Sequence, residues 1–162
     1  ETEAQLCNIK EHFHLVSSSK RMKLLMESLD AVAGKSLVFC RTRREVDYVA
    51  DFLSRSKYRV EAIHGDYRQS KRDKALKNFK EGKVNVLIAT DVAARGLHVN
   101  DIKTVINYRL PDDITTYIHR IGRTGRIGSE GVAVTLYTVA QKYFLKEFQA
   151  KVSAKRLELA SY

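Results

Sequence analysis

The sequence predicts an α/β fold, in which a mostly parallel, doubly wound sheet lies between two layers of helices. Short apolar runs rich in valine and isoleucine alternate along the chain with segments whose apolar residues recur at helical spacing. The chain has 162 residues, a single proline and no internal repeat or low-complexity stretch. We therefore expect residues 1–162 to form one three-layer domain with a single sizeable core.

Each predicted strand is a short, mainly apolar run, and several lack any polar interruption, as strands buried on both faces do. The predicted strands are residues 9–16, 36–40, 59–63, 84–89, 103–107 and 131–137. Sheets of this kind bind ligands at the carboxyl ends of their strands, so the loops there are the expected positions of a functional site. These loops follow Cys40, Ile63, Ala89 and Asn107, together with the segment leading to Ile121.

Five helices are predicted between and after these strands. Apolar residues recur at helical spacing over residues 19–33, and Gly34 supplies a C-terminal stop. Thr42 and Glu45 fit a capping box that opens the second helix, with Glu45 reaching back to the first turn. The remaining helices are expected over residues 69–81, over 114–121, and from about 139 into the Lys-rich tail.

The chain is strongly basic: 29 lysines and arginines outweigh 19 acidic residues, which gives a net charge of +10 and predicts an anionic partner. No apolar run approaches about 18 residues, which argues against a membrane-spanning helix. Two cysteines cannot build a disulfide framework, and five histidines without ligand spacing predict no metal site. The cysteine usage favours a reducing, cytoplasmic setting, and the first residues, neither Met nor signal-like, indicate a piece of a longer protein.

The most informative stretch runs from His119 to Arg126 and reads HRIGRTGR. Arg120, Arg123 and Arg126 recur at a spacing of three near the end of a short predicted helix, which places their guanidinium groups on one side of it. A planar guanidinium matches two phosphate oxygens at once, which a lysine cannot do. Because a glycine inside a helix is destabilising by about 1 kcal/mol, the interleaved glycines favour a phosphate-binding loop over a plain solvated helix.

This segment resembles the arginine-rich motif of superfamily 2 helicases, in the form found in DEAD-box RNA helicases. Further segments resemble that family's motifs in the same order, over most of the chain: LVFCRT from Leu37, HGD and then QxxR from His64, ATDVAARGL from Ala89, and VINY followed by LP from Val105. Several spaced motifs in the correct order are more specific than any one of them. The chain is thus similar to the second, C-terminal RecA-like domain of such a helicase.

The resemblance implies a role for each matching residue. Arg123 and Arg126 are implied to contact the γ-phosphate of ATP as arginine fingers, which neutralise charge developing on the transferred phosphoryl group. The other residues implied to bind the nucleotide are Gly96 and His98. Contacts with the RNA backbone are implied for Gly65, Gln69, Arg72, Thr90 and Thr42. Contacts between the two domains are implied for His119, Arg120, Asp91 and Arg95, of which Asp91 is alternatively a partner of an arginine finger.

The residue types agree with the RNA contacts independently of any family. Gly65 lets a phosphate approach the backbone amides, and Thr90 offers a hydroxyl group. Gln69 and Arg72 are one helical turn apart, so both reach the same strand end. Contacts of this kind predict binding that is independent of base sequence and strongly weakened by salt.

Two positions depart from the family's pattern. His98 stands where most members have an aspartate that accepts a hydrogen bond from the ribose of ATP, and a neutral imidazole accepts such a bond without the assistance of charge. Arg109 stands where another aspartate is common, and it adds positive charge near the implied interdomain face.

The resemblance implies the C-terminal half of an ATP-dependent RNA helicase, whose partners are RNA and an N-terminal RecA-like domain. That N-terminal domain, absent from this chain, would hold ATP on a phosphate loop together with Mg²⁺, so the isolated chain is expected to be inactive as an ATPase. Two alternatives stay open. A stand-alone RNA-binding or regulatory module would bind RNA tightly without ATP, and a DNA-directed motor of the same superfamily would act on DNA.

Overall fold

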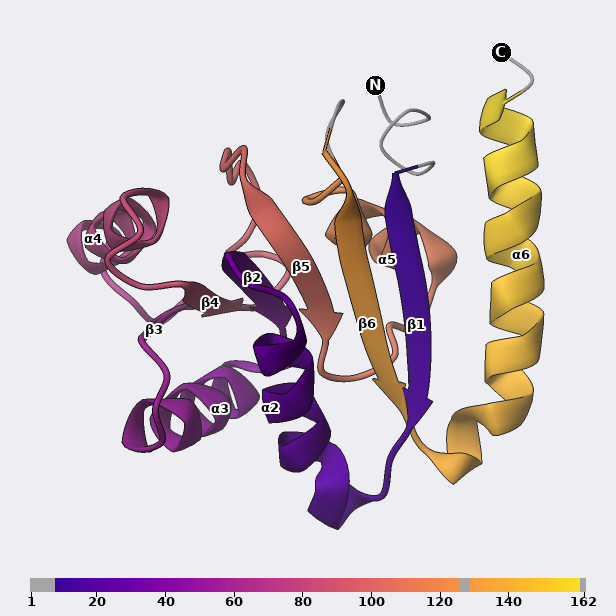
Figure 1. Cartoon of the computed structure of the whole chain (residues 1–162), viewed down its shortest axis with the longest axis horizontal. Helices are drawn as coiled ribbons and strands as arrows, with labels where there is room; N and C mark the ends of the chain where they lie inside the picture. The colour runs from indigo at the N-terminus through magenta and orange to yellow at the C-terminus, as the bar shows by residue number, and fades with distance from the viewer. Residues whose placement is uncertain (1–7, 126–128, 161–162) are drawn as a thin grey trace.

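Among residues 8–125 and 129–160, which this computed structural model describes, six parallel strands form one sheet in the order β1-β6-β5-β2-β4-β3 (Figure 1). The strands are β1 (Ile9–Leu15), β2 (Lys35–Phe39), β3 (Val60–Ile63), β4 (Val86–Ala89), β5 (Ile102–Asn107) and β6 (Gly131–Tyr137). β2, β4 and β5 lie inside the sheet and are almost wholly buried, which explains their unbroken apolar sequences.

Helices cover both faces of the sheet. They are α2 (Arg21–Ala31), α3 (Arg43–Arg55), α4 (Gln69–Lys80), α5 (Ile114–Ile121) and α6 (Lys142–Ala160), with the short 3₁₀ turns η1 (Ser18–Lys20) and η2 (Val139–Gln141). Successive side chains of β2 point to opposite faces of the sheet: Val38 packs with α2 and α3, and Phe39 packs with α4. Figure 1 shows α2 in front of the sheet and α5 behind it.

The last helix, α6, closes one end of the sheet. Its Leu145 and Phe148 pack with Tyr117 of α5 and Ile9 of β1, and the Tyr117 and Phe148 rings meet edge to face at 5.2 Å between centroids. This contact fixes α5, the helix that carries the arginine-rich motif, against the sheet. Within the part of the chain that is described, no helix combines the length and the apolar character needed to cross a membrane.

The structure confirms the predicted α/β fold, and the sheet is parallel throughout rather than mostly parallel. The helix over 114–121 and the strand over 131–137 have the predicted bounds, and the other elements differ by a few residues. β4 starts two residues later than predicted because the Val84 amide donates to the Asn78 carbonyl in the turn after α4. The segment over 19–33 begins as the turn η1, and the segment from 139 begins as η2.

The parallel arrangement brings the carboxyl ends of the strands to one edge of the sheet. Backbone hydrogen bonds tie neighbouring ends together: the Cys40 amide donates to Ala89 at 2.9 Å, and the Tyr108 amide donates to Phe39 at 3.0 Å. The segments that follow β2, β3, β4 and β5 therefore lie side by side. This edge is where the sequence predicts the functional residues.

Candidate functional site

An ion pair between a buried arginine and a half-exposed aspartate organises one end of this edge. The Asp91 carboxylate, which follows β4, accepts hydrogen bonds from Nε and Nη2 of Arg120 in α5 at 2.7 and 2.8 Å. Nη1 of Arg120 donates to Oδ1 of Asn107 at 3.1 Å, and the guanidinium lies 5.2 Å from the centre of the Phe39 ring. Arg120 is only 6% exposed, so its charge is satisfied within the chain.

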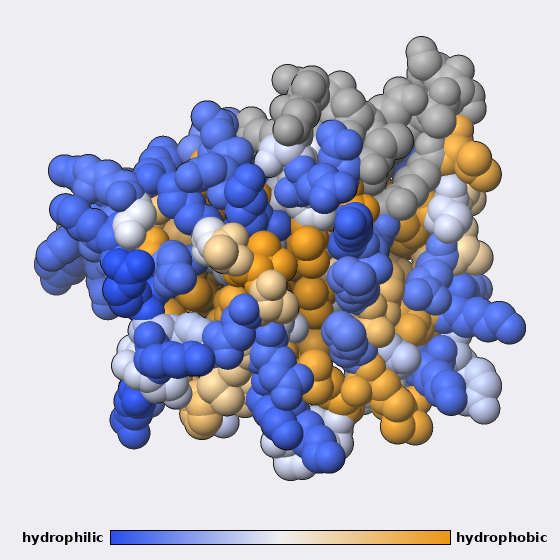
Figure 2. All heavy atoms as spheres, viewed as in Figure 1, coloured by the Kyte–Doolittle hydropathy of each residue, from blue (hydrophilic) through white to orange (hydrophobic). Residues whose placement is uncertain are grey.

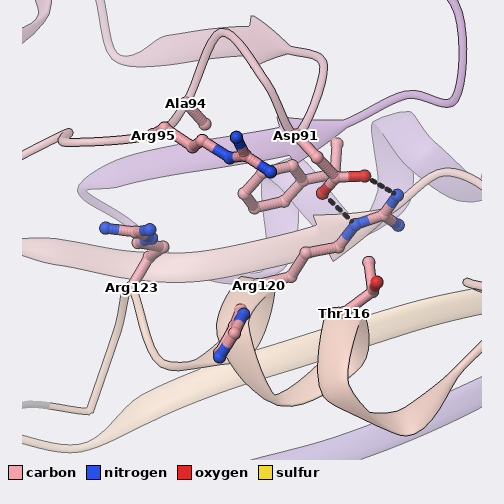
Figure 3. A pocket seen from close by; sticks show the side chains of 8 residues that line it. Asp91, Ala94, Arg95, Thr116, Arg120 and Arg123 are labelled. Atoms are coloured by element: carbon pink, nitrogen blue, oxygen red, sulfur yellow. Dashed lines mark hydrogen bonds and ion pairs between the residues drawn. The ribbon is translucent and has the colours of Figure 1, made fainter.

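A cavity of about 130 Å³ opens beside this pair. Its walls come from β2, from the segment after β4 and from α5 with the residues after it: Phe39, Asp91, Ala94, Arg95, Thr116, His119, Arg120 and Arg123. Figure 3 shows Arg95 on the segment after β4 and Arg123 on the residues after α5. In this view the Asp91–Arg120 pair separates these two arginines from Thr116. Since the only acidic group of the lining is already paired, the remaining cations make this cavity attractive to an anion.

Arg123 keeps its charge free of any carboxylate among the described residues. Its Nη1 donates to the Leu97 carbonyl at 3.2 Å, and its side chain is half-buried in the cavity wall. A guanidinium held by one neutral acceptor is positioned and still able to donate its other N–H groups to a ligand. The expectation that Arg123 acts as an arginine finger stays a prediction.

Thr124 and Gly131 hold the backbone that carries Arg123, and sequence analysis missed both. The Thr124 hydroxyl, 1% exposed, donates to the Ile102 carbonyl. A Cβ added at Gly131 would lie 2.5 Å from both the Gly125 amide nitrogen and the Thr124 hydroxyl oxygen, so only glycine permits this approach. Gly125 has a φ of 68°, which turns the chain away from the helix. The Thr124-Gly125 pair directly after Arg123 is the sequence signal that could have pointed to this packing.

Of the other residues implied to bind the nucleotide, the structure describes Gly96 and His98, and these two do not line the cavity. Arg126 lies outside the described residues. Gly96 has a φ of 74° in the turn after β4, and exposed His98 follows it; neither belongs to the cavity lining. The structure therefore gives no contact that explains the replacement of aspartate by His98.

The second set of predicted residues follows β2, β3 and β4 at the same edge. Thr42 caps α3, where its hydroxyl oxygen accepts from the Glu45 amide at 3.1 Å. Gly65 is exposed in the turn between β3 and α4. Thr90 is half-buried, and its hydroxyl oxygen accepts from the Ala93 amide at 3.4 Å. The two hydroxyl oxygens fix local backbone, and their hydroxyl hydrogens are still available to a ligand.

Gln69 and Arg72 begin α4 beside this turn. The Gln69 amide donates to Asp73 at 2.8 Å on the exposed side of the helix. Arg72 points inward instead: its Nη2 donates to the Ala93 carbonyl at 3.1 Å, and its buried Nε has no partner. Arg72 therefore also ties α4 to the segment after β4, a role that helical spacing alone did not indicate.

The unusual Arg109 has a partner in this chain. Its Nε donates to Oε2 of Glu45, whose side chain is only 12% exposed, while Oε1 of Glu45 accepts from the Arg41 amide at 3.2 Å. The predicted capping box is thus modified, since Glu45 reaches one residue further back than Thr42. Arg109 neutralises this half-buried carboxylate and closes α3 onto the end of β5.

The predicted interdomain set divides in two. His119 and Arg95 are exposed and line the cavity, so both remain available to a facing domain. Arg120 and Asp91 are committed to each other, and the burial of Arg120 revises the expectation that it reaches a facing domain. A guanidinium with this many internal acceptors holds the wall of the cavity rather than contacting another domain.

Comparison with known proteins identifies relatives of the chain. Residues 20–128 match the family described as helicase conserved C-terminal domain. The chain is 42% identical over 154 residues to the DEAD-box ATP-dependent RNA helicase CshA of Bacillus subtilis, covering 94% of this chain and 31% of that protein. It is 44% identical over 130 residues to the ATP-dependent RNA helicase vasa of Drosophila melanogaster, covering 80% of this chain and 20% of that protein.

Solved structures agree. A DEAD box protein from the hyperthermophile Methanococcus jannaschii superposes with a TM-score of 0.83 at 38% identity, covering 91% of this chain and 40% of that one. The C-terminal domain of the DEAD-box protein Dbp5 superposes with a TM-score of 0.74 at 33% identity, covering 86% of this chain and 87% of that domain. The chain thus spans about a third or less of the curated relatives' length and nearly the whole of an isolated C-terminal domain.

Proposed function

Because the chain belongs to the helicase conserved C-terminal domain family and is the C-terminal domain of a DEAD-box helicase, we propose that it forms the second half of an ATP-dependent RNA helicase. In this proposal residues 1–162 are one domain, and an N-terminal RecA-like domain in the same protein faces the cavity. The whole protein hydrolyses ATP and unwinds or remodels RNA. A cytoplasmic location stays a prediction.

The single observation that carries the proposal is the guanidinium of Arg123 in the wall of the cation-rich cavity, which contacts the Leu97 carbonyl and no carboxylate within the described part of the chain. A triphosphate tail fits this lining, because the cationic groups outnumber the one carboxylate and that carboxylate is already paired. Arg123, and Arg126 three residues further on, would then donate to the γ-phosphate and stabilise the charge that develops on it during hydrolysis.

The cofactor of the proposed enzyme is ATP, with Mg²⁺ held by the N-terminal domain. Among the described residues, no group of three or more histidine, cysteine or acidic side chains could hold a metal ion. In that enzyme, this chain would contribute cationic side chains placed against the phosphates of ATP. His119 and Arg95, which are exposed in the cavity, would contact the facing domain and couple its approach to the nucleotide.

The RNA backbone would lie along the neighbouring loops. Gly65 and the segments after β2 and β4 form a continuous edge, and Gln69 stands at the exposed start of α4. Small residues and hydroxyl groups suit a sugar-phosphate chain whose bases are not read. Binding would therefore be independent of base sequence and weakened by salt, as the net charge of +10 also favours.

Arginine substitutions in the full-length protein test the proposal. Arg123→Ala and Arg126→Ala should each lower the RNA-stimulated ATPase rate by about 10³-fold, because an arginine finger contributes at least that factor. Affinity for single-stranded RNA should stay close to that of the wild type. Arg55→Ala, which removes an exposed arginine at the far end of α3, is the matched control and should leave both quantities unchanged.

Two results would overturn parts of this proposal. Unchanged ATP turnover in Arg123→Ala and Arg126→Ala would remove the finger assignment. RNA-stimulated ATPase activity from residues 1–162 alone would show that no facing domain is needed.

A further inference from the structure

A buried histidine lies directly behind the exposed turn that follows β3. His64 is 2% exposed, and the three residues after it, Gly65, Asp66 and Tyr67, form the turn that leads into α4. The Tyr67 amide donates to the His64 carbonyl at 3.1 Å and closes the turn. The imidazole of His64 is therefore a buried side chain at the base of an exposed turn.

Both ring nitrogens of His64 are engaged. Nδ1 accepts a hydrogen bond from the Asp66 backbone amide at 3.2 Å, so Nδ1 carries no proton. The ring proton is then on Nε2, which donates to Oδ1 of Asp47 in α3 at 2.9 Å. One side of the ring thus holds the backbone of the turn, and the other side is anchored to a helix.

Neighbouring groups lock this arrangement in place. The Tyr67 ring packs on the imidazole at 4.1 Å between centroids, and its hydroxyl donates to the same Asp47 oxygen at 3.3 Å. Burial first, and then the Asp47 carboxylate, raise the pKa of Tyr67 to about 12, so its hydroxyl stays a donor at neutral pH. The ammonium of Lys71 in α4 lies 3.9 Å from the centre of the Tyr67 ring and covers the group from the α4 side.

The outer side of the turn is held by a separate contact. The exposed Asp66 carboxylate pairs with Arg43 of α3. This pair is largely exposed, so it is screened by solvent and salt and holds the turn weakly. The inner hydrogen bond to His64 is part-buried, because its acceptor belongs to a side chain that is 2% exposed, and we take it as the contact that fixes the direction of the Gly65 and Asp66 amides.

We propose that His64 is a positioning residue for RNA binding: its Nδ1 holds the Asp66 amide, and through it aims the backbone of Gly65 at the RNA phosphate, while Asp47 keeps the ring in place. This inference rests on the proposed function, because it assigns His64 a part in the RNA contact rather than in the core alone. His64 itself touches no RNA. In this role His64 acts through Nδ1 as a hydrogen-bond acceptor and not as a cation.

Two substitutions separate the two sides of the ring. In His64→Asn, the amide oxygen takes the place of Nδ1 and can still accept from Asp66, but the bond to Asp47 is lost. In His64→Gln, the longer amide can still donate to Asp47, but the acceptor that faces the turn is lost. Both variants lose the aromatic packing against Tyr67, so both should show a similar fall in Tm.

The affinity of the full-length protein for a fluorescein-labelled single-stranded oligouridylate should distinguish them. Fluorescence anisotropy in the presence of a non-hydrolysable ATP analogue measures this affinity. His64→Gln should bind about 10-fold more weakly than the wild type, which is the upper range for one backbone hydrogen bond, and His64→Asn within about 2-fold. His14→Gln on the exposed edge strand β1 is the matched control and should bind normally.

Equal losses of affinity in His64→Asn and His64→Gln, following their losses of stability, would overturn the inference and leave His64 a core residue. Amide hydrogen exchange at Asp66 tests the same bond without RNA: it should stay protected in His64→Asn and become fast in His64→Gln. Protection retained in His64→Gln would also overturn the inference. If the wild type fails to bind the oligouridylate at all, the proposed function fails, and the exchange rates still decide whether His64 holds the turn.

Discussion

The cavity beside Arg123 and the turn at Gly65 occupy the same edge of the sheet and are built in opposite ways. In the cavity, a part-buried ion pair between Asp91 and Arg120 forms the wall, and cationic side chains line the open space. In the turn, the His64 side chain faces the protein and accepts from the Asp66 amide, and Gly65 is exposed. Figure 2 shows hydrophilic side chains gathered over α4, the helix that the turn begins.

The difference shows how each region can be damaged. If the cavity works through charge as proposed, removal of the Arg123 guanidinium should abolish its effect and leave the fold intact. A turn that works through backbone direction is damaged by changes behind it, where stability and binding are linked. In the cavity, therefore, one substitution should lower activity without lowering stability and another should lower stability. In the turn, substitutions behind the backbone should lower RNA binding and stability together.

The largest effect on stability is expected from Arg120→Ala, within the cavity itself. The substitution leaves Asn107 buried without its donor and Asp91 without its partner, which should lower the free energy of unfolding by about 3 kcal/mol. For a domain of this size, that loss corresponds to a fall in Tm of about 6–12 °C. Thermal denaturation of Arg120→Ala and Arg123→Ala side by side measures it, and Arg123→Ala should unfold near the wild-type temperature. A similar Tm for both variants would contradict the assignment of Arg120 to the structure of the wall and of Arg123 to ligand binding.

A smaller effect is expected from two glycine substitutions that compare the regions directly. Gly131→Ala forces a Cβ against the Gly125 amide and Thr124, so it should lower stability by about 1–3 kcal/mol and displace Arg123. A Cβ at Gly65 would lie 3.8 Å from Nε of Arg43, an ordinary contact, so Gly65→Ala should fold normally. Gly131→Ala should show both a lower ATPase rate and a lower free energy of unfolding in urea. Gly65→Ala should be impaired in RNA affinity alone, and a fall in its stability would contradict this account of the turn.

The smallest effect concerns Tyr67 and alkaline pH. The pKa of Tyr67 rises from 10.0 to about 12, so the folded chain holds this proton more firmly than the unfolded chain. Its contribution to stability is fully present below pH 10 and is lost as the pH rises through about 12. The difference in unfolding free energy between wild type and Tyr67→Phe should be constant up to pH 10 and shrink above it. Urea denaturation at several alkaline pH values checks this, and a difference independent of pH would contradict it.

Much of the site was predictable because its residue types carry their chemistry with them. Arginine repeated with glycine predicts phosphate binding, and apolar runs predict the strands at whose ends such residues gather. The roles within that set were not predictable in the same way. Arg120 and Arg123 are three residues apart in one motif, yet one is buried in an ion pair and the other is available.

The sequence alone determined the α/β class, the order of strands and helices, and the edge at which the candidate functional residues gather, since each follows from local periodicity and the residues after each strand. The tertiary structure alone decided the partners: Asp91 for Arg120, Glu45 for Arg109, and Asp47 for His64. The physical reason is that hydrophobic periodicity is a local property of the chain. An ion pair or a buried hydrogen bond depends on which distant segments the completed sheet brings within about 3 Å.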